Sequence, residues 1–304
     1  MQMTAYISLI IATLCWGGNA VAGKLAVGHV SPMFLTFWRW FFAVAIIVVI
    51  SLPQLKKDWP VVRKHLPILL FFGVVGYTGF NAMLYSALQY TSAINAAIEQ
   101  AGIPMLIFLL NFLLFRAGVS LAQMVGFSLT LVGVALTAAH GDFATLLQLT
   151  LNFGDGLMLL AVIAYSVYTI SLRWKPAIHW KSLMAIPALG ALLGSIPLVF
   201  WEASNDALIW PDSYGWTITL FTALFPSLVA QILYIRGVEI IGANRAGLFI
   251  NLVPVFGTLL SVILIGETLH VFHIVALALT LGGIAIAEKG RPPVVAVKKP
   301  AAAE

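Results

Sequence analysis

The chain has 304 residues, of which 61% are apolar and 9% are charged, and its mean hydropathy is +1.01. Soluble domains carry ~25% charged residues, so this composition excludes an ordinary water-soluble globular protein. The formal net charge of +5 comes from basic residues scattered between apolar runs, which argues against a nucleic-acid-binding surface. The composition indicates an integral membrane protein.

Apolar runs of membrane-crossing length follow one another along the whole chain. Each is close to the ~20 residues that an α-helix needs to cross a bilayer, and none alternates as a transmembrane β-strand does. The sequence therefore predicts an all-α integral membrane protein with ten transmembrane helices. We expect these helices at roughly residues 4–26, 33–52, 66–88, 93–115, 120–138, 154–173, 182–201, 215–236, 245–266 and 271–288.

Basic residues lie in alternate linkers between these helices, with Lys24 and Arg39 as the two exceptions. Positively charged loops stay in the cytoplasm, so both termini are expected there. The plasma membrane, most simply a bacterial inner membrane, is the expected location. The tail at 290–304 is rich in Pro, Ala and Lys, and we expect it to be disordered.

The two halves of the sequence resemble each other when the chain is shifted by about 150 residues. Each half holds five predicted helices, an odd number, so the second copy must cross the membrane in the opposite sense. We expect a first repeat at 1–140, an outer linker at 141–153 and a second repeat at 154–289. Inverted repeats around a central cavity are typical of transporters that work by alternating access. The aligned pairs are Pro104 with Pro254, Thr130 with Thr280, and Gly133 with Gly283.

Pro104 and Pro254 fall within predicted helices at equivalent positions of the two repeats. A proline removes one backbone hydrogen bond from a helix interior and bends the helix. We expect both prolines to kink their helices around the cavity, although transmembrane prolines are also common packing features.

Four segments carry a resemblance to a known family: LCWGGNAVAGKLA, SPMFLTFWRWFFAVAI, ALQYTSAINAAIEQAGIPM and ANRAGLFINLVPVFGTLLSVILIGETL. Their order and spacing resemble the EamA-type branch of the drug/metabolite transporter superfamily over nearly the whole chain. The resemblance implies ten helices in two inverted five-helix repeats, and export or exchange of small metabolites. Within the family, the chain looks most like the YddG-like amino-acid exporters.

One signature of that family is present only once. Gly266 and Glu267 follow the ninth predicted helix, whereas Arg116 and Ala117 stand at the equivalent place after the fourth. We therefore expect Glu267 to be a solvated loop carboxylate without a special role.

Polar side chains inside the apolar runs locate the predicted cavity. Tyr77, Asn81 and Tyr85 recur every four residues and so share one face of a helix. Polar groups at such depth usually face the bundle interior or a wet cavity, although they also join helices to one another. The residues expected to line the substrate cavity are Trp16, Asn19, Tyr77, Asn81, Tyr85, Gln100, Tyr165, Tyr168, Ser227 and Gln231.

Charged residues within the predicted helices are the strongest indications of functional residues. Arg39 lies about two turns from the outer end of its helix, and we expect it to snorkel there or to form an ion pair rather than to contact substrate. Glu99 is expected to pair with Lys24 near the outer end of the first helix. A second hypothesis for Glu99 is that it carries a coupling proton.

Amides, phenols and aromatic rings together suit zwitterionic or amphipathic solutes. We therefore expect a secondary transporter that exports small organic metabolites, chiefly amino acids including aromatic ones. Export of cationic drugs or other metabolites, and a channel-like facilitator, are the alternatives. The sequence offers no buried nucleophile with a base, as an intramembrane enzyme needs. We expect no cofactor, no metal and no nucleic acid, and a monomer embedded in the lipid bilayer.

Overall fold

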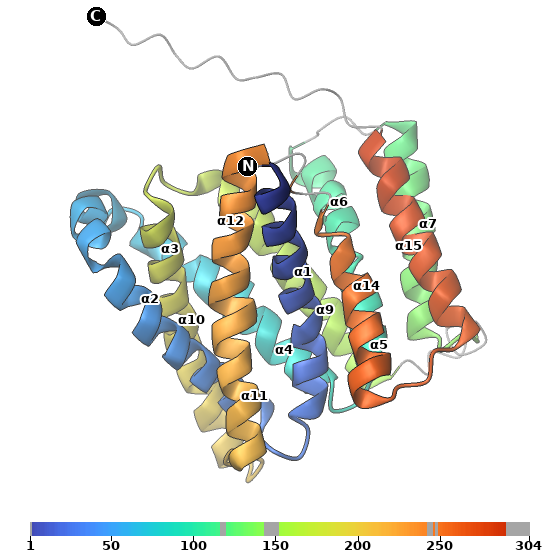
Figure 1. Cartoon of the computed structure of the whole chain (residues 1–304), viewed down its shortest axis with the longest axis horizontal. Helices are drawn as coiled ribbons and strands as arrows, with labels where there is room; N and C mark the ends of the chain where they lie inside the picture. Colours follow the sequence, from blue (N-terminus) through green and yellow to red (C-terminus); the bar gives the residue numbers. More distant parts are fainter. Residues whose placement is uncertain (1, 116–119, 143–151, 242–245, 247–248, 290–304) are drawn as a thin grey trace, which may run out of the picture.

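The computed structural model describes residues 2–115, 120–142, 152–241, 246 and 249–289. Every regular element within these ranges is a helix (Figure 1). The elements are α1 (Gln2–Leu25), α2 (Pro32–Val62), α3 (Leu66–Phe71), η1 (Phe72–Gly79), α4 (Phe80–Ala87), α5 (Ala93–Gln100), α6 (Ile103–Phe115), α7 (Leu121–Ala138), α9 (Phe153–Ser171), η2 (Leu172–Trp174), α10 (Trp180–Ser204), α11 (Ser213–Leu224), η3 (Phe225–Val229), α12 (Ala230–Ile241), α14 (Leu252–Leu260), η4 (Ser261–Ile265) and α15 (Val271–Lys289).

The described helices have the length and composition of membrane spans. Seven continuous helical runs are long and apolar enough to cross a bilayer, and three shorter apolar helices accompany them in the described part of the chain. Large apolar side chains such as Phe200 and Ile263 are 72% exposed on the outside of the bundle. Lipid tails, unlike water, cover such side chains without a free-energy cost. The predicted all-α membrane fold is confirmed.

The helix termini distinguish the two ends of the bundle. Figure 1 shows that α1 begins and α15 ends at the same end, which we name the terminal end. At the opposite, distal end, α1 is followed by α2, and α4 is followed by α5. The described chain therefore begins and ends on one side of the bundle.

The repeat is visible where α7 packs against α15. Thr130 Oγ1 lies 3.4 Å from the backbone oxygen of Thr280, the residue with which it aligns in sequence. The two helices run in opposite directions in Figure 1, as an inverted repeat requires. A Cβ atom on Gly283 would lie 2.5 Å from the carbonyl oxygen of Gly126, so glycine permits the close contact. These glycines pack helices within one chain.

Equivalent spans of the two repeats are also interrupted in the same way. The third span contains the π-helical segment η1, and the eighth contains η3. A π-helical turn has one residue more than an α-helical turn, and such turns frequently occur at functional sites. Asn81 follows shortly after η1, and Ser227 lies within η3; both belong to the central polar cluster described below.

Pro104 and Pro254 both lie in the first turn of a helix, and the kink expected at each stays a prediction. Pro104 is the second residue of α6, after a turn at Ala101 and Gly102, and Pro254 is the third residue of α14. The first-turn N–H groups of a helix have no intrahelical partner, so a proline there costs no hydrogen bond. Each proline thus begins a helix just after a turn in its span.

The second helix is longer than its apolar run. We expected it to end near residue 52, but α2 continues through Pro53 and Pro60 to Val62. A proline in a helix interior removes a single backbone bond, which packing against a neighbouring helix can offset. The last turns of α2 are held by Asp58, whose Oδ2 accepts a hydrogen bond from the hydroxyl of Ser182 on α10 at 2.7 Å.

Candidate functional site

Arg39 lies at the centre of a polar cluster inside the bundle. Its side chain is 5% exposed. Nη1 donates to Asn19 Oδ1 at 2.7 Å and to Asn81 Oδ1 at 2.8 Å, and also to the hydroxyl of Tyr85. Nε donates to Ser227 Oγ at 2.7 Å. The cluster therefore joins α1, α2 and α4 of the first repeat to η3 of the second.

The local sequence around Ser227 explains its place in the cluster. Pro226 has no N–H, so the carbonyl group of Thr222, four residues earlier, lacks its usual helical donor. The Ser227 hydroxyl donates to this carbonyl at 2.8 Å. Its oxygen remains free to accept from Arg39. The π-helical turn also leaves the Pro226 carbonyl oxygen available to Trp16 Nε1, which donates to it at 3.1 Å.

The amides of the cluster are oriented by further hydrogen bonds. Asn81 Nδ2 donates to the backbone oxygen of Tyr77, one turn earlier on the same span, at 2.6 Å. This contact leaves Asn81 Oδ1 to face the guanidinium group of Arg39. The hydroxyl of Tyr85 donates to Asn19 Oδ1 at 2.9 Å. The cluster thus presents only oxygen acceptors to Arg39.

The positive charge of Arg39 has no counter-charge among the described residues. An arginine stays protonated in proteins, and its partners here are amides, a phenol and a hydroxyl. Neither ion pair of the described chain includes Arg39. Nη2 makes no hydrogen bond within the described residues. A buried cation is stable when an anion joins it, so the site is suited to bind a carboxylate.

Aromatic rings form one wall beside the guanidinium group. Trp40 and Tyr77 stack with ring centroids 4.9 Å apart, and Tyr77 meets Tyr168 edge to face at 5.5 Å. Tyr165 continues the wall at 5.4 Å from Tyr168. The Cζ atom of Arg39 lies 5.4 Å from the Trp40 ring centroid. Such a wall can hold an apolar or aromatic side chain next to a bound carboxylate.

Two expected cavity residues lie apart from these contacts. Gln100 Nε2 donates to the backbone oxygen of Ala96 on its own helix at 3.0 Å. Gln231 is half-buried, and its side chain makes no hydrogen bond among the described residues. The structure gathers Asn19, Asn81, Tyr85 and Ser227 around Arg39, and their role towards a substrate stays a prediction.

The expectations for Arg39 and Lys24 are wrong. Arg39 does not snorkel to the bundle end and has no acidic partner in the described chain, because neutral acceptors from α1, α4 and η3 surround it. Lys24 Nζ donates to the backbone oxygens of Leu88 at 3.0 Å and Thr91 at 2.7 Å. These carbonyls end a helix and take the lysine, so the described residues hold no Lys24–Glu99 ion pair.

Glu267 is a helix-capping residue, so the expectation of a solvated loop carboxylate is wrong. Its Oε1 accepts from the N–H of Ala93 at 2.8 Å, and its Oε2 accepts from the N–H of Ile94 at 3.0 Å. These are the first N–H groups of α5, where a carboxylate is favoured by unpaired donors and by the helix dipole. Glu267 thus ties the start of α15 to α5.

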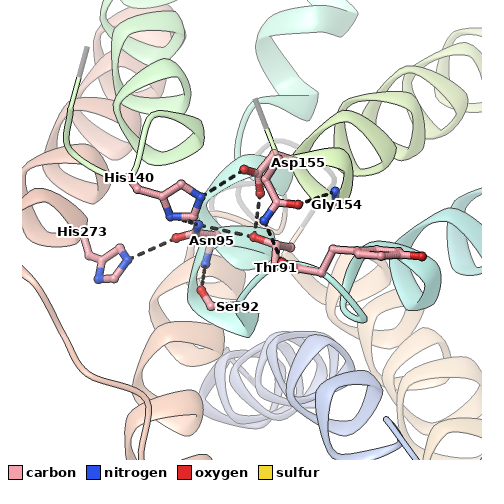
Figure 2. Close-up of polar contacts among 9 residues, drawn as sticks. Thr91, Ser92, Asn95, His140, Gly154, Asp155 and His273 are labelled. Atoms are coloured by element: carbon pink, nitrogen blue, oxygen red, sulfur yellow. Dashed lines mark hydrogen bonds and ion pairs between the residues drawn. The ribbon is translucent and has the colours of Figure 1, made fainter. Parts of the chain in front are cut away.

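A second polar cluster lies at the distal end (Figure 2). It was not predicted from the sequence. Thr91 Oγ1 donates to Asp155 Oδ1 at 2.6 Å, and His140 Nε2 lies 3.4 Å from Asp155 Oδ2. His273 Nε2 lies 3.1 Å from Asn95 Oδ1. His140 has φ 51°, a left-handed conformation that costs energy for a residue other than glycine. Asp155 is a charge inside an apolar run, and this signal could have revealed the cluster.

A cavity of about 570 Å³ opens beside this cluster. It lies at the start of α5 and of α15, away from Arg39. Its polar lining includes Ser92, Asn95, His140, Glu267, His270 and His273.

The sequence profile of the EamA-like transporter family matches residues 3–139 and again residues 152–288. The chain is 28% identical over 285 residues to the uncharacterized transporter YetK of Bacillus subtilis, covering 93% of this chain and 86% of that protein. The uncharacterized transporter YyaM of the same organism is 26% identical, with 93% of both proteins covered. A chloroplastic WAT1-related protein of Arabidopsis thaliana is 24% identical, covering 91% of this chain and 67% of that protein.

A solved crystal structure is also similar, with a TM-score of 0.63 and 21% identity. The superposition covers 93% of this chain and 96% of that chain. At this level of identity, the likeness shows a shared fold.

Proposed function

The chain belongs to the EamA-like transporter family, and we propose that it exports zwitterionic amino acids, aromatic ones included, by alternating access. The family makes the protein a multi-pass membrane transporter of small molecules within the drug/metabolite transporter superfamily. Its own polar groups support the narrower choice of substrate and mechanism.

The buried charge of Arg39 carries the proposal. A guanidinium group that only neutral acceptors contact, with Nη2 unused among the described hydrogen bonds, is a ready partner for a substrate carboxylate. The wall of Trp40, Tyr77, Tyr165 and Tyr168 suits an apolar or aromatic side chain, and ring faces also attract an ammonium group. The site thus offers a partner for the carboxylate, the ammonium group and the side chain of an amino acid.

The repeat supports alternating access. Arg39 is contacted by helices of both repeats, so a movement of one repeat against the other changes the surroundings of a bound solute. The distribution of Lys and Arg supports a cytoplasmic terminal end and an outward-facing distal end.

The same charge argues against the cationic-drug alternative, because a buried guanidinium group repels a cationic solute at close range. A channel-like facilitator would use the same polar lining. The two mechanisms differ in exchange kinetics, since a carrier exchanges solute faster than it leaks it.

Counterflow in proteoliposomes tests the proposal. Vesicles loaded with unlabelled amino acid are expected to take up labelled amino acid transiently and with saturation, most strongly for aromatic side chains. Arg39→Gln removes hydrogen bonds to a charged group, each worth ~1.5–3 kcal/mol, so exchange is expected to fall about ten- to a hundredfold.

Lys57→Gln is the matched control, because it removes one exposed positive charge from the same helix and should leave exchange unchanged. Flux without saturation would support a channel and contradict the carrier. Undiminished amino-acid exchange by Arg39→Gln would contradict the assigned site. Preferred exchange of organic cations would contradict the substrate class.

A further inference from the structure

Glu99 is a buried acid whose carboxyl oxygens have no partner. The residue is 1% exposed, and neither Oε1 nor Oε2 accepts a hydrogen bond within the described part of the chain. The free-energy cost of burying a carboxylate without hydrogen bonds is large, whereas a neutral carboxylic acid is tolerated far better. In this conformation, the environment of Glu99 favours a protonated side chain.

Glu99 lies next to the distal polar cluster. It follows Asn95 by one helical turn on α5, so both side chains project from the same face. Asp155 on α9 is joined to Asn95 through Thr91, whose hydroxyl donates to Asp155 Oδ1 and accepts from Asn95 Nδ2 at 3.4 Å. Asp155 is itself 1% exposed, whereas the His140 side chain beside it is 48% exposed. A titratable path therefore leads from the cavity surface to the buried acid.

The hydrogen bond from the N–H of His270 to His273 determines which atoms donate along this path. The N–H of His270 donates to His273 Nδ1 at 3.1 Å, so the ring proton of neutral His273 is on Nε2 and is donated to Asn95 Oδ1. Asn95 Nδ2 then faces His140 Nδ1 at 3.4 Å. This leaves the proton of neutral His140 on Nε2, the nitrogen that lies 3.4 Å from Asp155 Oδ2.

We propose that Glu99 binds a coupling proton, and that His140 and Asp155 exchange this proton with the aqueous cavity at the distal end. The weak contact between Asn95 Nδ2 and His140 Nδ1 opens, a hydronium ion in the cavity gives a proton to this nitrogen, and a water molecule leaves. His140 gives its Nε2 proton to Asp155 Oδ2, and Asp155 gives its proton to Glu99. Each donor returns to its starting charge, with the proton of His140 now on Nδ1, and one O–H bond has formed on Glu99.

The other titratable groups near Glu99 are few in the described residues. From the neighbouring helices these are Lys24 at the end of α1, His273 on α15, and Glu267 and His270 before α15. Lys24 is held by backbone carbonyls and Glu267 by backbone N–H groups. Both are therefore engaged elsewhere, and α14 and α7 contribute no charged side chain in their described residues.

This inference rests on the proposed transport function, in which amino acid moves outward while the proton moves inward. The test uses proteoliposomes that contain a pH-sensitive dye. An amino-acid gradient is expected to drive proton movement through the wild-type protein, and an imposed pH gradient is expected to drive amino-acid accumulation. Counterflow, which needs no net proton movement, is measured on the same vesicles.

Glu99→Gln and Asp155→Asn are expected to lose both proton-linked activities and to retain counterflow. His140→Gln is expected to slow proton movement and to retain counterflow, and Asp206→Asn, an exposed acid at the distal end, serves as the control. Wild-type counterflow without proton movement would overturn the inference and leave the transport function standing. Full proton coupling in Glu99→Gln would also overturn it. If Glu99→Gln does not fold, unchanged proton kinetics in His140→Gln overturns the relay.

Discussion

Glu202 and Asp58 each cap the helix on which the other one lies. Glu202, near the end of α10, accepts a hydrogen bond from the N–H of Phe34 in the first turn of α2 at 3.1 Å. Asp58, near the end of α2, accepts from the N–H of His179 at 3.1 Å and from the hydroxyl of Ser182 at 2.7 Å, both at the start of α10. The two antiparallel helices are thus fastened at both ends across the boundary between the repeats.

The loss of either cap is expected to destabilise the protein. A helix that loses its N-terminal capping group loses ~0.5–2 kcal/mol, so Glu202→Ala and Asp58→Ala should each lower the melting temperature in detergent. The two sites are far apart along the helices, so the double variant should show the sum of both decreases. Asp206→Asn is the control. An unchanged melting temperature in Glu202→Ala would contradict this role.

An acid at position 81 is expected to change stability and transport in opposite directions. Asn81 Oδ1 lies 2.8 Å from Arg39 Nη1, so Asn81→Asp supplies the counter-charge that Arg39 lacks. The variant should melt at a higher temperature, and it should exchange amino acids more slowly because its carboxylate competes with the substrate. Thermal unfolding and counterflow measure the two effects.

Asn81→Leu separates the effect of charge from that of the lost amide. It removes an acceptor from a buried cation, which typically costs ~1–3 kcal/mol or more, so it should lower both stability and transport. If Asn81→Asp also lowers the melting temperature, the uncompensated charge of Arg39 is not the feature that governs this site.

Adjacent glycines on α15 offer a matched pair of substitutions. A Cβ atom on Gly283 would lie 2.5 Å from the carbonyl oxygen of Gly126, whereas a Cβ atom on Gly282 would meet nothing within 4 Å. Alanine is favoured over glycine in a helix by ~1 kcal/mol, so Gly282→Ala should be neutral or stabilising. Gly283→Ala should lower the melting temperature, because α7 and α15 must move apart. Equal effects of both variants would contradict the described contact.

Much of the architecture follows from the sequence because lipid constrains it strongly. A membrane span must be helical and apolar over a fixed length, so hydropathy alone predicts the helices. Asn81 and Tyr85, one turn apart on one helix face, were predicted to share surroundings, and both contact Arg39. Helical periodicity was sufficient for this grouping.

Periodicity does not report how each helix is rotated against distant helices. It therefore misplaced Arg39, whose acceptor Ser227 lies on the other repeat. It also missed the capping roles of Glu267 and Glu202, since each carboxylate meets a helix that is more than a hundred residues away in sequence. Such contacts depend on tertiary packing, and a charged residue next to a linker looks the same in sequence whether it is solvated or capping.

The uncompensated guanidinium group of Arg39 also affects which ions can cross the membrane through the protein. A fixed positive charge in a medium of low dielectric constant raises the electrostatic barrier to sodium and potassium ions, while it lowers the barrier to a carboxylate. A cell stores energy as gradients of inorganic cations. If Arg39 lies on the solute path, as we propose, organic acids and zwitterions can cross without those gradients being dissipated.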